Sequence, residues 1–209
     1  MKNIIFSSPF KLRNYGSGKN IGLIIFCAVL FTGIIFGAVS GRNADGDLMK
    51  RLDFIFQTNY HIRCSQGLLS AFVSSFGSAV IFLMIIFLLG LSLWGGFFSW
   101  TVPFFKGYGY GLSVGYLYGL YGFYGVGYNL LIVLPGMFIS SIVISKAAQE
   151  AMINSVKIIN LFGKNEVRDD PHIQMKKYLK MMFVLLILCT VSSLIDMLFA
   201  MCFSWIFKF

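Results

Sequence analysis

The feature that most restricts this chain is a long run without charge, because no side chain in residues 68–105 carries a formal charge. About 20 apolar residues in a helix cross the hydrocarbon core of a bilayer, so this run is too long for one upright span. Two divisions fit: a single long tilted helix that ends at Phe105, or a tight turn near residues 93–96 that makes a helical hairpin. Lys106 then lies at the membrane interface in the first case and inside the bilayer in the second.

The composition of the whole chain points the same way. Its 209 residues are 57% hydrophobic and 12% charged, and the mean hydropathy is +0.79. Soluble domains carry about 25% charged residues, and a chain this apolar has too little polar surface to be covered in water. These values exclude a cytosolic enzyme, a disordered regulator and a secreted disulfide scaffold. We predict an all-α integral membrane protein with a single transmembrane domain over residues 1–209.

Five apolar segments are predicted to cross the membrane, near residues 21–39, 72–94, 98–122, 126–145 and 181–205. The first is longer than the apolar core of a cleaved signal peptide, so we expect it to remain as a span. A polar loop at 40–66 follows it. The basic segment 146–180 has helical spacing of its apolar residues, which predicts a cytoplasmic amphipathic segment. Within that segment, two aspartates before Pro171 predict a fresh helix start.

The basic residues give the orientation. The chain has 17 Lys and Arg against 8 Asp and Glu, a net charge of +9. Because these residues flank apolar runs, the positive-inside rule explains them better than nucleic-acid binding, and they are expected near anionic lipid headgroups. The N-terminal segment holds four Lys/Arg and the segment 146–180 holds seven. If both are cytoplasmic, four spans lie between them, and a fifth places the C-terminus outside a bacterial cell membrane.

Residues 107–127 are the most biased stretch, with eight glycines and six tyrosines. Four of the glycines recur at every fourth position and form one stripe of small residues on a helix: Gly107, Gly111, Gly115 and Gly119. Such a stripe lets another helix approach closely, which matters in lipid because no hydrophobic drive joins helices there. The helix it contacts is either in the same chain or in a partner, including a second copy. Whether residues 107–122 cross fully or re-enter is left open.

Two residues inside apolar runs are further candidates. Pro135 removes a backbone donor in the fourth span and predicts a kink. That kink is either structural or part of a substrate site, as in transporters with broken helices. Asp196 is an ionisable group inside the fifth span, where such groups are costly and often functional. Lys106 is a candidate ion-pair partner for Asp196 if residues 68–105 form the hairpin.

Nothing in the sequence indicates catalysis. No zinc-protease, P-loop or nucleophile-elbow signature is present. The four cysteines have no CxxC spacing, and the two histidines, in different loops, have no metal ligand nearby in sequence. We therefore expect no catalytic residues, no metal and no cofactor, and we expect that the protein is not an enzyme.

Several segments, taken in order, resemble the stage II sporulation protein M family. Residues 31–38 (FTGIIFGA) resemble the apolar GxxFGA ending of its first span, and residues 89–93 (LGLSL) resemble its LGxS segment. Phe-Lys-Gly at 105–107, followed by GLSVGY at 111–116, resembles its FKG…GFxxGF core, and VLP at 133–135 resembles its LP corner. The likeness covers about residues 20–150. Family members commonly follow Leu-Pro with Gln-Asn, where this chain has Gly136 and Met137.

The resemblance implies a multi-pass membrane protein without catalytic activity of its own. In spore-forming bacteria, the family member works in engulfment and holds the stage II sporulation proteins D and P, which are peptidoglycan hydrolases, at the septal membrane. By resemblance we expect a scaffold for cell-wall remodelling, in which Lys106, the glycine stripe and Pro135 serve helix packing or partner contact. The alternative is a transporter or permease subunit with a site near Pro135 and Asp196.

Overall fold

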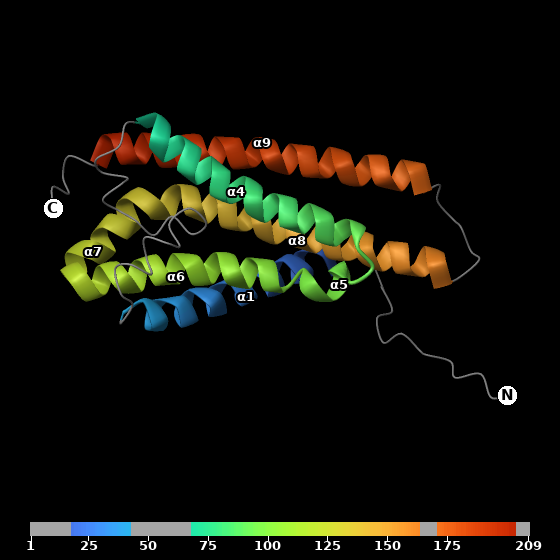
Figure 1. Ribbon diagram of the computed structural model, residues 1–209, viewed down its shortest axis with the longest axis horizontal. Helices are drawn as coiled ribbons and strands as arrows, with labels where there is room; N and C mark the ends of the chain where they lie inside the picture. The colour runs from blue at the N-terminus through green and yellow to red at the C-terminus, as the bar shows by residue number, and fades with distance from the viewer. Residues whose placement is uncertain (1–17, 43–67, 164–170, 204–209) are drawn as a thin grey trace.

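The computed structural model describes residues 18–42, 68–163 and 171–203 (Figure 1). Within these residues the chain is helical and has no β-strand, which confirms the all-α class. The polar loop expected at 40–66 lies largely in residues 43–67, outside the described part. In chain order the elements are α1 (Gly18–Gly41), α4 (Leu68–Leu91), α5 (Gly95–Phe98), α6 (Thr101–Tyr121), α7 (Phe123–Tyr128), the π-helical turn η1 (Asn129–Val133), α8 (Leu134–Gly163) and α9 (Pro171–Phe203).

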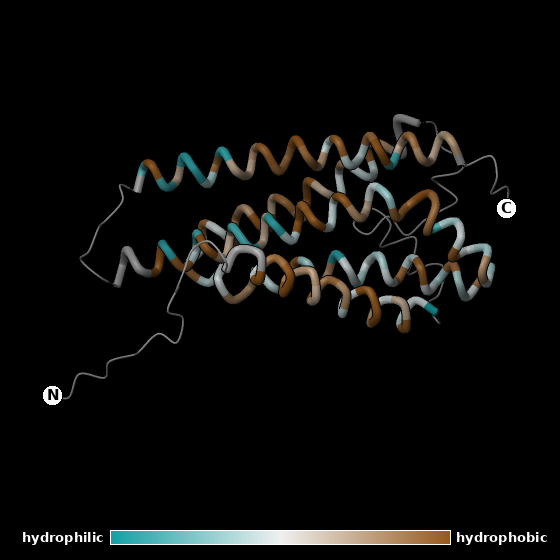
Figure 2. Tube along the Cα trace, turned by 180° about the vertical axis from the view of Figure 1, so that it is seen from behind, coloured by the Kyte–Doolittle hydropathy of each residue, from teal (hydrophilic) through white to brown (hydrophobic). Residues whose placement is uncertain are grey.

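Four helical segments are long and apolar enough to cross a membrane: Ile21–Gly41, Phe72–Leu91, Phe123–Ile159 and His172–Cys202. Many of the large apolar side chains on these segments are exposed. Figure 2 shows apolar residues along the length of the helices. Many of the polar residues lie toward the end of the bundle where α8 ends and α9 begins. This is the pattern that a helix bundle in a bilayer needs, since its outer surface faces hydrocarbon. α6 has the length of a span, but its glycines and tyrosines make it less apolar than these four.

The uncharged run forms a helical hairpin, the second of the two divisions considered above. α4 ends at Leu91, and the chain returns through the short α5 into α6. Side chains of α8 hold this turn: Asn154 Nδ2 donates to the Gly90 carbonyl at 2.9 Å. Ser155 Oγ donates to the Ser92 carbonyl at 2.8 Å and accepts from the Gly96 N–H at 2.9 Å. These bonds satisfy backbone groups that the end of a helix leaves without partners.

α8 is the central helix of the bundle, in contact with α1, α4, α6 and α9 (Figure 1). Its small residues Ala147, Ala148 and Ala151 are fully buried in the core that α4 and α9 complete. The separate amphipathic segment expected at 146–180 is therefore divided differently: its first part continues α8 without a break, and its last part is the start of α9 at Pro171. Along this part of α8, Ala148 is buried in the core, whereas Ile159 is 44% exposed.

The return from α6 to α8 uses two irregular features. Gly122, between α6 and α7, has φ 59°, in the left-handed region that favours glycine. η1 then leads directly into Pro135, in the first turn of α8. Proline lacks the N–H that would bond the carbonyl four residues earlier, and a π turn is one of the known ways a helix accommodates such a gap. Figure 1 shows the helical path bending between α7 and α8.

Candidate functional site

A seam of glycines joins α1 to α6. From α1 it takes Gly33, Gly37 and Gly41, and from α6 it takes Gly107, Gly111, Gly115 and Gly119. Residue numbers rise together along the two helices, so α1 and α6 run parallel, as Figure 1 also shows. This glycine seam is the most extensive helix pairing in the described chain.

Each glycine of the seam faces a backbone carbonyl of the opposite helix. A Cβ atom on Gly107 would overlap the Leu30 carbonyl oxygen, and one on Gly37 would overlap that of Tyr108. Only Gly119, at the end of the seam, is exposed. Close Cα–H···O contacts of this kind contribute about 0.5–1 kcal/mol each. The seam therefore holds two backbones in direct contact without side chains between them.

The stripe on α6 thus packs within the chain rather than against a partner. Sequence reasoning found this stripe but missed its counterpart on α1. The signal was present, because Gly33, Gly37 and Gly41 have the same four-residue spacing. Two stripes with one period can interlock over their whole length, which a single stripe does not reveal.

A second feature is a buried carboxylate of α9 that lies beside the start of α8. Asp196 of α9 is 7% exposed and accepts a hydrogen bond from Ser75 Oγ of α4. Gly136 of α8 lies against the same carboxylate, and a Cβ atom there would overlap it. Ser192 Oγ, one turn earlier on α9, donates to the Gly136 carbonyl at 2.6 Å. The first turn of α8, next to Pro135, therefore packs directly against Asp196 of α9.

Lys106 of α6 is buried in the same part of the bundle. It is 6% exposed, its Nζ lies 3.2 Å from Ser78 Oγ, and the ammonium sits 5.0 Å from the centre of the Phe82 ring. Ser75 and Ser78 are three residues apart on α4 and so share one face. Lys106 and Asp196 therefore contact the same face of α4.

The structure places Lys106 and Asp196, which the sequence suggested as an ion pair if the hairpin forms, on the same face of α4. Lys106 and Asp196 each contact a serine hydroxyl of α4, and Pro135 lies next to Gly136, which packs against the Asp196 carboxylate. Buried charges are tolerated when they are paired and hydrogen-bonded. The serines that connect them had no distinguishing signal in the sequence. Among the described residues, no group of three or more His, Cys, Asp or Glu side chains is placed to hold a metal.

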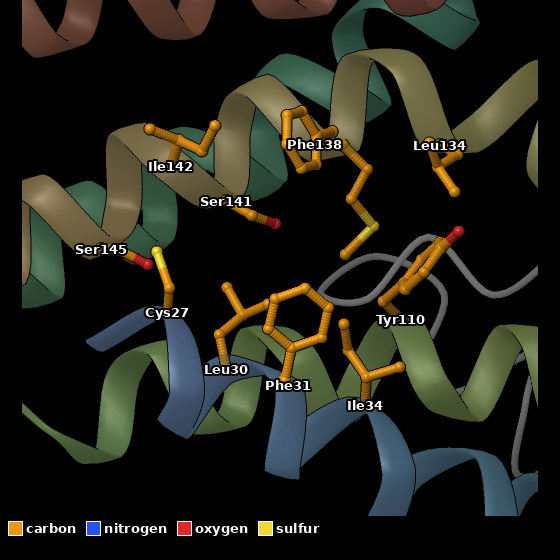
Figure 3. A pocket seen from close by; sticks show the side chains of 11 residues that line it. Cys27, Leu30, Phe31, Ile34, Tyr110, Leu134, Phe138, Ser141, Ile142 and Ser145 are labelled. Atoms are coloured by element: carbon orange, nitrogen blue, oxygen red, sulfur yellow. The ribbon is translucent and has the colours of Figure 1, made fainter. Parts of the chain in front are cut away.

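A cavity of about 240 Å³ lies between α1 and α8 (Figure 3). Apolar side chains of both helices form most of its wall, among them Leu30 and Phe31 from α1 and Phe138 from α8. Tyr110 of α6 also lines it, as do the hydroxyl-bearing Ser141 and Ser145. Neither of the buried charged residues described above is among the side chains of its wall.

Several side chains in the described part of the chain have buried polar atoms without a hydrogen-bond partner, and Asn129 and Ser145 are two of them. Asn129, at the start of η1, is 1% exposed, and both its amide oxygen and its amide nitrogen are unsatisfied. Ser145 of α8 is fully buried, and its hydroxyl is also unsatisfied. Such groups cost free energy unless something supplies the missing bond, so each calls for a physical account.

No family model, curated protein or solved structure matches this chain. The glycine seam, the buried charges and the cavity are therefore the features that bear on its function.

Proposed function

We propose that this protein is a five-span membrane scaffold of a bacterial cell-wall remodelling complex, which anchors and positions peptidoglycan hydrolases at the cell membrane. The observation that carries the proposal is that the charged groups of the interior are sealed in helix packing. Lys106 and Asp196 are 6% and 7% exposed, and the cavity between α1 and α8 contains neither of them. A transporter needs polar groups along an accessible path, whereas a scaffold needs rigid spans.

The proposal counts α6 as the fifth span. Its 21 residues are about 30 Å long at 1.5 Å per residue, enough to cross the hydrocarbon core. It lies parallel to α1, which is one of the four segments with the length and apolar character of a span. Lys176 and Lys177 are exposed in the first turns of α9. Figure 1 shows that α9 begins toward the same end of the bundle as α1. The positive-inside rule makes that end cytoplasmic and puts the C-terminus outside.

The partner class comes from the resemblance of residues 20–150 to the stage II sporulation protein M family. The chain itself supplies no chemistry in this proposal, so its hydrolase partners would carry the reaction. Exposed apolar side chains on the outer faces, such as Phe183 and Leu198 of α9, give the membrane anchors of such partners a surface to contact. A rigid bundle with these faces would fix where the hydrolases act.

One observation favours a second candidate, a transporter or permease subunit. The irregular helix around Pro135 meets the buried Asp196 through Gly136. An interrupted helix beside an intramembrane carboxylate is the arrangement that ion-coupled transporters use. In that case Pro135 and Asp196 would belong to a substrate path that opens in another conformation.

A crosslinked pull-down of the tagged protein from its native membranes, read by mass spectrometry, tests the proposal. The control is a tagged, unrelated multi-pass protein of matched abundance. Peptidoglycan hydrolases recovered with this chain and absent from the control are the expected result. Recovery of an ATPase with no wall enzyme would contradict the scaffold and favour the transporter.

A further inference from the structure

The cavity between α1 and α8 opens on the outer surface of the bundle. Phe31 and Phe138 stand at its rim and are 59% and 58% exposed. Both belong to segments with the length and apolar character of membrane spans. In a bilayer, the mouth of this cavity therefore faces hydrocarbon, where a lipid tail is the neighbouring molecule.

We propose that this cavity binds one acyl chain of a bilayer phospholipid, whose ester carbonyl accepts a hydrogen bond from Ser145. The proposal goes beyond the scaffold function and does not depend on it. A helix is about 10–12 Å across with its side chains, so a hollow of about 240 Å³ is too small to take one. A flexible aliphatic chain fits such a space, and each buried methylene contributes about 0.8 kcal/mol.

Ser145 identifies the polar part of the ligand. Its hydroxyl is fully buried without a partner, and Figure 3 shows it beside the Cys27 sulfur at one end of the cavity. Ser141 lies one turn away on the same face of α8, and its hydroxyl also points into the space (Figure 3). A hydroxyl buried without a partner costs about 1–3 kcal/mol. An ester carbonyl, which is an acceptor, removes that penalty, whereas an aliphatic chain alone does not.

The neighbours of Ser145 set the direction of the lipid. Lys146 is the next residue in the chain, and its Nζ lies 3.0 Å from both Gln149 Oε1 and Glu150 Oε1. The Gln149 side chain packs on Gly22, near the beginning of α1, so this end of the cavity is nearer the basic end of the bundle. A phospholipid with its ester at Ser145 would hold its phosphate near Lys146. Its acyl chain would run toward Tyr110 and the start of α8.

Photo-crosslinking in vesicles tests this inference. The full-length protein is reconstituted in phosphatidylethanolamine and phosphatidylglycerol that contain a phospholipid with a diazirine on one acyl chain. After illumination, mass spectrometry compares labelled peptides from the cavity wall with those from the exposed face of α9 around Phe183 and Ile187. We expect several-fold more label on the wall. Ser145→Leu, which fills the cavity, should remove that excess and leave the α9 label unchanged.

Equal labelling of the two faces would mean ordinary surrounding lipid and would overturn the proposal. So would a wall label that Ser145→Leu does not change, or a crosslink at the wall to a second protein in place of lipid. Cys27→Leu, which fills the cavity from the opposite wall, gives the same test if Ser145→Leu fails to fold. Cysteine alkylation of the unaltered protein adds a measurement without mutation. Added phospholipid should slow the reaction of Cys27 several-fold and leave that of the exposed Cys202 unchanged.

Discussion

Gly111 of α6 lies directly against Gly37 of α1, where a Cβ atom on Gly111 would sit only 2.9 Å from the Gly37 Cα. The two backbones are therefore in contact, and this contact repeats in steps of four residues along the glycine seam. In lipid, helices gain no hydrophobic free energy from each other, so van der Waals contact and Cα–H···O contacts must hold them together. The seam explains why α1 packs against α6 rather than against α4, the next helix in the described part of the chain.

Adding one methyl group inside the seam should destabilise the protein. We expect Gly111→Ala to lower the melting temperature in detergent, because the new Cβ would overlap the Ile34 carbonyl oxygen. Overpacking of this kind costs about 1–3 kcal/mol when the backbones must move. The melting temperature can be read from the loss of the folded peak in size-exclusion chromatography after heating.

Gly77 gives the matched control, since it is also a helical glycine, but a Cβ atom added there would meet no other atom within 4 Å. Gly77→Ala should leave the melting temperature unchanged or raise it, because alanine favours a helix over glycine by about 1 kcal/mol. Equal effects of the two substitutions would mean that the close approach at Gly111 does not hold α1 to α6.

Lys106 and Asp196 should show strong energetic coupling. Removing one charge leaves the other buried and uncompensated, so we expect Lys106→Met or Asp196→Leu alone to cost about 3–5 kcal/mol of stability. The double variant should recover most of this loss, because apolar residues often replace a buried ion pair without penalty. A double-mutant cycle on unfolding free energies measures the coupling. Simply additive losses would show that the serines of α4 do not join the two charges.

Ser155→Ala should loosen the turn between α4 and α6. The hydroxyl serves both the Ser92 carbonyl and the Gly96 N–H, so its removal leaves two backbone groups without that partner. The expected cost is about 1–3 kcal/mol in unfolding free energy. Thr190→Val is the control, because Thr190 Oγ1 donates within its own helix, to the Ile187 carbonyl, and Thr190 is only half-buried. A similar effect of both substitutions would contradict the prediction that the Ser155 hydroxyl holds the turn between α4 and α6.

Asn129→Leu should stabilise the protein. Both polar atoms of this buried amide are unsatisfied, and a leucine of similar shape removes the penalty of about 1–3 kcal/mol for each orphaned group. The prediction is a higher melting temperature than that of the unaltered chain. A lower one would reveal that Asn129 makes a bond in the folded protein, to water or to another molecule.

Part of this fold can be predicted from the sequence, and part of it cannot. The uncharged run at 68–105 and the apolar composition predict helices for a membrane, and the four-residue glycine period predicts close packing on α6. Neither pattern predicts which helix packs against α6, because a glycine stripe defines only one of the two surfaces in contact. The helical periodicity of the segment 146–180 does not reveal that α8 continues through its first part and that α9 begins at Pro171. The fully buried alanines of α8, such as Ala147 and Ala151, are small residues of the kind that allow close helix packing.

The polar links are harder to foresee. Ser75 and Ser78 stand in an apolar helix where serine is unremarkable, and their contact with Asp196 and Lys106 depends on the register between three helices. The π turn before Pro135 could not be predicted either, since a proline predicts an irregularity in a helix but not its form. Local sequence sets the helices, while contacts across helices depend on distances that only the folded bundle defines.

The most direct test of the scaffold account compares the unaltered chain with the double variant Lys106→Met/Asp196→Leu in its native membranes. The variant keeps the glycine seam but removes both interior charges, and its folding is checked by thermal unfolding. If these charges serve packing alone, the variant should recover peptidoglycan hydrolases as well as the unaltered chain and should preserve the cellular phenotype. A folded variant that recovers no wall enzyme, or that loses a solute-dependent phenotype, would contradict the account and assign the charges to transport.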